Sequence, residues 1–137
     1  MSRILGLGLD LVEQERVRRA VNRHGERFVQ RIAGEEEVAS RAGSLRTESL
    51  AGLFAAKEAV LKALGTGWAE GVGFRQVVVL RLPSGAPTVR FEGEAARRAE
   101  RLGVSRVHLS ITHDGGVAAA VAVLEGTPRG DRSTDGD

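Results

Sequence analysis

The sequence contains no cysteine and no tyrosine, and only two lysines stand among its 20 basic residues. Without cysteine, disulfides, thiolate zinc sites and cysteine nucleophiles are excluded. No apolar run approaches the roughly 20 residues of a membrane span, and no charged leader with an apolar stretch opens the chain. We therefore expect a cytoplasmic protein without membrane contact.

What is present fits one soluble globular domain. The chain has 137 residues, of which 42% are apolar and 28% are charged, and its net charge is +2. This length is sufficient to bury a real core. We expect a single domain over residues 1–125 and a disordered polar tail over residues 126–137, where the composition turns to Gly, Ser, Thr and Asp.

Hydrophobic periodicity predicts an α+β fold, with an antiparallel sheet packed against a long helix. The best helix is 48–64, with Thr47 as its N-cap and Gly65 ending it. A second helical region, 13–43, is expected to break near Gly25 and Gly34. The expected strands are 3–12, 74–82, 87–91, 105–112 and 117–125, with a short helix at 93–102 and a turn at 113–116.

The two lysines lie five positions apart on the long helix. Lys57 falls in the middle of an apolar stripe, where a charge is costly unless it is paired. It either has a buried partner or extends along its stem to solvent. Glu58 and Lys62 form an i, i+4 pair, which in isolation is typical of a surface salt bridge. The glycines of the loop at 65–67 either let backbone N–H groups approach an anion or simply end the helix.

Two further places could carry chemistry. Asp10 is a carboxylate on an apolar strand, and metal ligation together with Glu58 would explain it. Two carboxylates suit Mg²⁺, which takes its other ligands from water and phosphates. On strand 105–112 the side chains of His108, Ser110 and Thr112 point one way, followed by His113 and Asp114 at the turn. No nucleophile elbow is present, which argues against a Ser-His-Asp hydrolase.

Three segments together resemble the acyl-carrier-protein synthase group of phosphopantetheinyl transferases. They are G-L-G-L-D-L-V-E-x-x-R at 6–16, F-A-A-K-E-A-V-L-K-A-L-G-T-G at 54–67, and V-H-L-S-I-T-H-D at 107–114. The resemblance covers residues 3–124. It implies an enzyme that uses Mg²⁺ to move phosphopantetheine from coenzyme A onto a serine of apo-acyl carrier protein, for fatty-acid or polyketide synthesis.

The resemblance also assigns site residues. Asp10 and Glu58 would hold Mg²⁺, and catalysis would involve both together with Lys62 and His113. Arg16 would dock the acidic carrier protein. The coenzyme would contact Lys57, Lys62, Gly65, Thr66, Gly67, Ser110 and His113. In the family, coenzyme A lies between neighbouring subunits of a trimer, so a homotrimer with active sites at the subunit interfaces is expected.

Some points stay open at this stage. The serine proton could go to a metal-bound water, to Glu37, or to the corner formed by His113 and Asp114. Two residues depart from the family pattern: Leu53 replaces a usual basic residue, and Gly34 replaces a usual Ser or Thr cap near Glu37.

Two other functions are weighed against transfer. An Arg-rich first helix could bind nucleic acid, but six Glu are mixed among the seven Arg of residues 13–41, so we expect no nucleic-acid partner. A non-catalytic coenzyme-binding relative would not need Asp10 and Glu58, and both are present.

Overall fold

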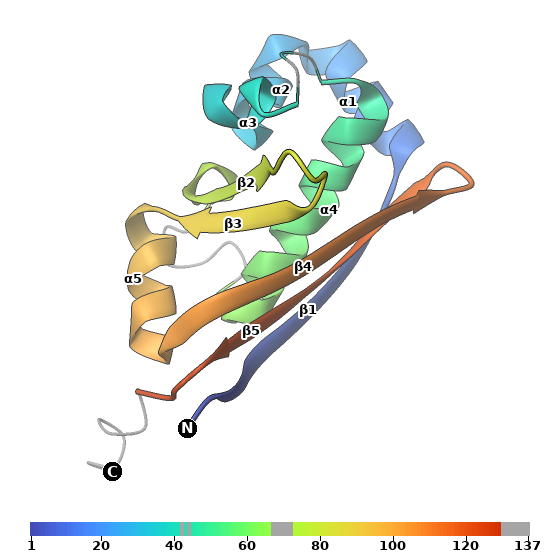
Figure 1. Ribbon diagram of the computed structural model, residues 1–137. Coiled ribbons are helices and arrows are strands. Elements are labelled where there is room, and N and C mark those ends of the chain that lie inside the picture. Colours follow the sequence, from blue (N-terminus) through green and yellow to red (C-terminus); the bar gives the residue numbers. More distant parts are fainter. Residues whose placement is uncertain (42, 44, 67–72, 130–137) are drawn as a thin grey trace.

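The computed structural model describes residues 1–41, 43, 45–66 and 73–129. It is an α+β domain with antiparallel pairing and a long central helix, as predicted, and its strands form two sheets (Figure 1). The larger sheet has the strand order β1-β5-β4, formed by β1 (Arg3–Glu13), β4 (Val104–Asp114) and β5 (Val117–Gly126). The smaller sheet pairs β2 (Val77–Arg81) with β3 (Pro87–Phe91).

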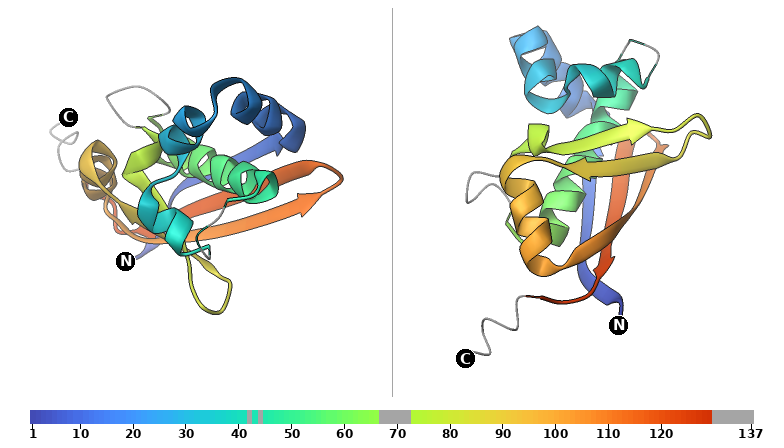
Figure 2. Two further views of the ribbon diagram at one scale, coloured as in Figure 1. Left: turned by 90° about the horizontal axis from the view of Figure 1, so that it is seen from above. Right: turned by 60° about the vertical axis from the view of Figure 1, so that its left-hand side comes forward.

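The helices lie on one side of the larger sheet, and α4 (Thr47–Leu64) is the one that packs along its face (Figure 2). The others are α1 (Gln14–His24), α2 (Glu26–Ile32), α3 (Glu35–Ala39) and α5 (Gly93–Leu102). The predicted breaks near Gly25 and Gly34 are confirmed, since these residues separate α1, α2 and α3. Among the described helices, none combines the length and the hydropathy that a membrane span requires.

Helix α4 is the centre of the core. From Leu50 to Leu64 every residue is buried or half-buried except Lys62, so the helix is surrounded by protein on nearly all sides. Small alanines on α4 and β5 let the backbones of helix and sheet lie close together, and Leu50, Leu53, Leu61 and Leu124 fill the spaces between them. Because α4 is packed on nearly all sides, the side chains that it directs into a site are held in fixed positions.

Four boundary details differ from the expectations. Arg46 is the N-cap of α4 and makes no side-chain cap bond, so the expected capping by Thr47 is wrong. Residues Phe74–Gln76 form the 3₁₀ helix η2 before β2 instead of the start of a strand. Strand β4 continues through Asp114, which confines the tight turn to Gly115 and Gly116, both with positive φ. Strand β5 continues to Gly126, and most of the expected tail lies outside the described residues.

Candidate active site

Asp10 lies on the face of β1 that packs against α4. Gly8 lies on the same face, and a Cβ there would sit 1.8 Å from the carbonyl oxygen of Ala59. The glycines of β1 therefore serve close packing of strand and helix. Because the two backbones approach so closely, Asp10 reaches α4, where Lys62 Nζ donates a hydrogen bond to Asp10 Oδ1 at 3.0 Å.

Asp10, Glu58 and Lys62 line one cavity of about 440 Å³. The three polar side chains come from β1 and α4, and Arg16 of α1 joins them. The apolar part of the wall includes Val17, Ala20, Phe28 and Phe54. The structure thus brings together four of the residues singled out from the sequence, although 48 positions separate the two carboxylates.

The two carboxylates of this cavity act on each other. Burial raises the pKa of the Glu58 carboxyl, the nearby Asp10 carboxylate raises it further, and Lys62 opposes both effects. A divalent ion would relieve the repulsion between the two carboxylates. Among the described residues no group of three or more His, Cys, Asp and Glu side chains gathers, so the donor set here is two carboxylates. That set fits Mg²⁺, which binds few protein ligands.

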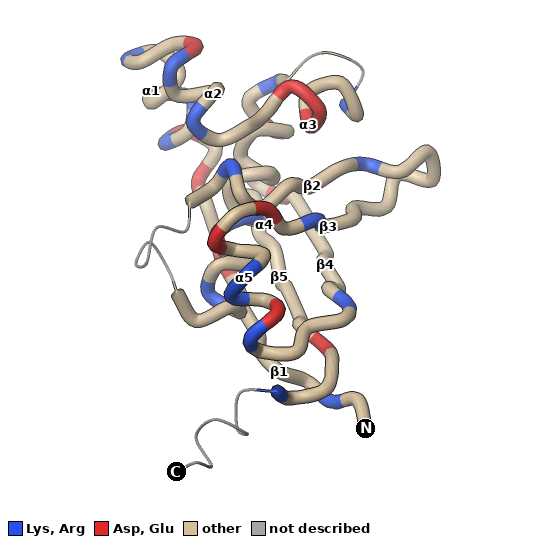
Figure 3. Tube along the Cα trace, turned by 90° about the vertical axis from the view of Figure 1, so that its left-hand side faces the viewer, with Lys and Arg blue, Asp and Glu red and all other residues tan. Residues whose placement is uncertain are grey.

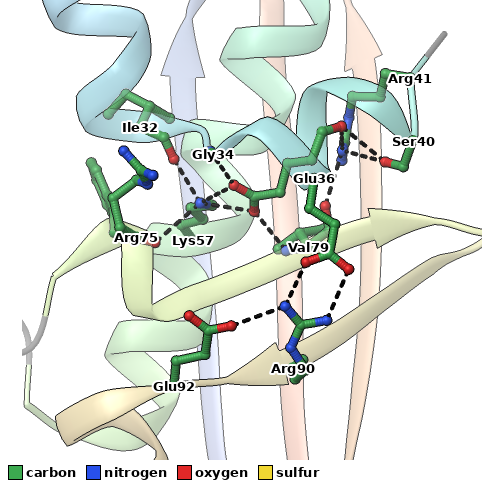
Figure 4. A network of polar contacts seen from close by, with 12 residues as sticks. Ile32, Gly34, Glu36, Ser40, Arg41, Lys57, Arg75, Val79, Arg90 and Glu92 are labelled. Atoms are coloured by element: carbon green, nitrogen blue, oxygen red, sulfur yellow. Dashed lines mark hydrogen bonds and ion pairs between the residues drawn. The ribbon is translucent and has the colours of Figure 1, made fainter. Parts of the chain in front are cut away.

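Lys57 does not line this cavity, so the structure does not place it with Glu58 and Lys62 as the expected coenzyme contact would require. Its side chain is 0% exposed. As Figure 4 shows, its Nζ donates to the carbonyl oxygens of Ile32 (2.6 Å) and Phe74 (3.0 Å) and to the Glu37 carboxylate (2.9 Å). Burial lowers the pKa of Lys57, and Glu37 opposes that shift. Consecutive helical residues point about 100° apart, so residue 57 can face the core while residue 58 faces the cavity.

Glu37 is buried with Lys57 and is only 2% exposed. Its carboxylate also accepts hydrogen bonds from the backbone N–H groups of Gly34 (2.9 Å) and Val79 (2.7 Å). The bond to Gly34 is the reciprocal half of a capping box, and it needs no Ser or Thr at position 34. A carboxylate so enclosed has no access to a substrate hydroxyl, which removes Glu37 from the candidate bases.

His113 lies on the other side of α4. Its Nε2 is 3.0 Å from the carbonyl oxygen of Glu48, and a Cβ at Gly52 would come within 2.8 Å of the same nitrogen. The bare backbone of Gly52 therefore lets the imidazole lie against the helix. A second cavity of about 190 Å³ opens here, and its lining includes Arg41, Leu53, Arg81 and His113.

Ser110 and His113 are not brought together in one chain. They are three positions apart on one strand, so they point to opposite faces of the sheet. Ser110 is exposed on the outer face opposite Val121, whereas Val107, Leu109 and Ile111 pack on the core. The sequence interpretation missed this because it ended the strand at residue 112.

The structure describes two of the three loop residues expected to contact the coenzyme, Gly65 and Thr66. Gly65 adopts the left-handed conformation that ends α4, and its N–H bonds to the carbonyl oxygens of Leu61 and Lys62. That N–H is therefore not available to an anion. Thr66 is buried, and Gly67 lies outside the described residues.

Arg41, Arg81, Phe28 and Phe54 were not singled out for these cavities from the sequence. Phe54 was visible only as one member of the helix stripe. Arg41 and Arg81 gave no signal, because nothing local distinguishes them from the other arginines. On α1, Arg18 and Arg19 both pair with Glu15, so the basic face expected for nucleic-acid binding is interrupted.

The comparisons with known proteins agree on one family. The model of the 4'-phosphopantetheinyl transferase superfamily matches residues 6–122, and the chain belongs to this superfamily. Within it, the chain is 50% identical over 128 residues to the holo-acyl-carrier-protein synthase of Anaeromyxobacter sp. (strain K), covering 90% of this chain and 98% of the relative.

Two solved structures are similar in fold as well. The holo-acyl-carrier-protein synthase of Neisseria meningitidis superposes with a TM-score of 0.81 at 32% identity, covering 89% of this chain and 98% of that one. The Helicobacter pylori holo-acyl-carrier-protein synthase in complex with coenzyme A superposes with a TM-score of 0.76 at 30% identity, covering 86% of this chain and 98% of that one.

Proposed function

We propose that the protein is a holo-acyl-carrier-protein synthase, which transfers 4'-phosphopantetheine from coenzyme A to a serine of apo-acyl carrier protein with the help of Mg²⁺. The observation that carries the proposal is the shared cavity of Asp10, Glu58 and Lys62. The superfamily supports the reaction type. The coenzyme A complex of the H. pylori relative supports the donor.

The residues divide the work of a phosphoryl transfer. The serine oxygen of the carrier forms a bond to the β-phosphorus of coenzyme A, and the bond to the bridging oxygen breaks, releasing adenosine 3',5'-bisphosphate. The proton of the serine hydroxyl passes to water. Asp10 and Glu58 would hold Mg²⁺, which supplies charge neutralisation on the pyrophosphate. The side chain of Lys62 is 52% exposed and has a flexible stem. Its ammonium can therefore leave the Asp10 carboxylate and donate a hydrogen bond to a phosphate oxygen instead.

The second cavity suits the nucleotide end of the coenzyme. His113, Arg41 and Arg81 line it without any acidic side chain. Arg41 donates to backbone carbonyls of Glu37 and Val79, so its guanidinium is held in place, whereas Arg81 is exposed. Two guanidinium groups around the buried Leu53 would supply the positive charge that position 53 lacks.

The two cavities lie on different sides of α4, so we propose that coenzyme A spans two subunits of a homotrimer. The outer face of the larger sheet supports such an assembly. Leu7, Leu9 and Leu11 are 66%, 65% and 66% exposed there, in register with Val123, Val121 and Ala119. Continuous apolar surface of this kind marks a protein interface, and a second and third copy of the chain are its proposed occupants.

The carrier protein is proposed to dock beside Arg16. Figure 3 shows basic residues recurring along α1 and α2 at this end of the molecule. Complementary charge steers an acidic partner and fixes its register. Arg16 lines the same cavity as Glu58, so a carrier docked there presents its serine to the proposed Mg²⁺ site. The cytoplasmic location expected from the sequence remains a prediction.

The test is direct transfer. The purified chain is incubated with apo-carrier, coenzyme A and Mg²⁺, and mass spectrometry follows the added phosphopantetheine arm. We expect transfer by the wild type and by the control Glu100→Ala, whose side chain is 72% exposed and distant from the cavity residues in sequence. Glu58→Ala should abolish transfer while leaving the fold intact. Full activity of Glu58→Ala at ordinary Mg²⁺ would contradict the assignment.

A further inference from the structure

The proposed reaction makes no use of the fully buried ion pair of Lys57 and Glu37. An ammonium has three N–H donors, and all three of Lys57 find acceptors within 3.0 Å. The two side chains are 0% and 2% exposed, so neither touches a ligand in the cavity. Taking two charges out of water costs several kcal/mol per ion before their mutual attraction is counted. This cost indicates that the pair has a function other than packing of the core.

The pair joins four segments that are remote in the chain (Figure 4). Lys57 is on α4 and bonds to the last residue of α2, Ile32, and to the first residue of η2, Phe74. Glu37 is on α3 and accepts the N–H of Val79 in the middle of β2. One ammonium and one carboxylate therefore fix α2, α3, η2 and β2 relative to α4.

Two of these segments determine the wall of the Glu58 cavity. Helix α2 carries Phe28, which lines that cavity, and its end is tied to Lys57 through Ile32. Phe74 packs edge-to-face on Phe54 of the same wall, with ring centroids 5.0 Å apart.

We propose that Lys57 and Glu37 form a positioning pair for the transfer reaction, holding the α1–α2 wall and its carrier-docking face in register with Glu58. This inference rests on the proposed function. Stability alone would not require the pair, because apolar or neutral side chains of similar volume often replace a buried ion pair without loss. What neutral side chains lack is the set of directed bonds to three separate segments.

The test uses the double variant Lys57→Met with Glu37→Gln, which removes both charges, keeps the volume and leaves one amide oxygen for the two backbone N–H groups of Gly34 and Val79. We expect its melting temperature to fall, because the carbonyl oxygens of Ile32 and Phe74 lose their buried donor, but no further than that of Leu61→Ala. Its coenzyme A affinity, measured by calorimetry with Mg²⁺, should stay within about threefold. Its kcat with the carrier should fall on the order of ten- to a hundredfold, the size expected when reacting groups shift by about 1 Å. Lys57→Met alone should lower the melting temperature as well.

Leu61→Ala is the matched control, because Leu61 is equally buried on α4 and bonds to none of the four segments through its side chain. It should lose stability and keep kcat, with rates normalised to the folded fraction. The proposal is overturned if the double variant keeps wild-type kcat, if its coenzyme affinity falls together with kcat, or if it fails to fold at 10 °C. An inactive wild type would instead refute the proposed function, and this inference with it.

Discussion

Gly8 offers a sensitive test of how β1 and α4 define the site. A Cβ at this position would meet the carbonyl oxygen of Ala59 at 1.8 Å, its carbonyl carbon at 2.8 Å and the amide nitrogen of Ala63 at 2.9 Å. Ordinary contacts begin near 3.4 Å, so Gly8→Ala must separate strand and helix by about 1.6 Å, the difference between 3.4 and 1.8. All three atoms are backbone, and no side-chain rotation relieves the clash.

The cost of this separation falls on both stability and function. Overpacking of a core costs about 1–3 kcal/mol, and a rigid backbone clash belongs at the upper end of that range. For a domain of this size, about 3 kcal/mol corresponds to a drop in melting temperature on the order of 10 °C. Asp10 lies two residues from Gly8 on the same face of β1, so the same movement draws its carboxylate away from Glu58.

Thermal unfolding and Mg²⁺ titration of Gly8→Ala measure the two effects. Gly73→Ala is the control, because Gly73 has a φ of −134° and a Cβ added there would meet nothing within 4 Å, so its melting temperature should not change. If Gly8→Ala has the melting temperature and the Mg²⁺ affinity of the wild type, the close approach of β1 and α4 does not define the site.

In EDTA, Glu58→Gln should be more stable to urea than the wild type at neutral pH. The pKa of Glu58 is raised above its ordinary value of 4.5 in the folded state, so the wild type loses stability as the pH rises from 4.5 through the folded-state pKa. Below pH 4.5 the two proteins should be equally stable. Arg81→Ala should raise the KM for coenzyme A about fivefold, close to 1 kcal/mol, in a steady-state assay, and an unchanged KM would remove Arg81 from the nucleotide site. Leu9→Asp should convert a trimer into monomers in light scattering, whereas an unaltered mass would place the interface elsewhere.

The sequence was most informative where periodicity is strong. The long helix, its glycine end and the strands of the larger sheet were predicted because each has a clear apolar pattern over many residues. The start of β2 was not, since η2 shows no pattern that distinguishes it from a strand. The αL end of α4 at Gly65 followed from the absence of a Cβ there.

The site could be predicted only in part. Asp10 and Glu58 were paired by resemblance, because no local rule relates residues on a strand and a helix so far apart. The periodicity placed Lys57 correctly on the apolar face but did not reveal its partner, Glu37, which is 20 positions away on a short helix. Whether a lysine on such a face reaches solvent or a buried carboxylate depends on tertiary packing.

Asp10 and Glu58 are proposed to bind one divalent ion that faces the pyrophosphate. Calorimetric titration of Mg²⁺ in the presence of coenzyme A tests it, using the wild type, Asp10→Asn, Glu58→Gln and the control Glu100→Gln. We predict one ion per site in the wild type and in the control, with affinity lower by on the order of tenfold or more in each of the other two variants. Wild-type affinity in both Asp10→Asn and Glu58→Gln would show that these two carboxylates do not hold the ion.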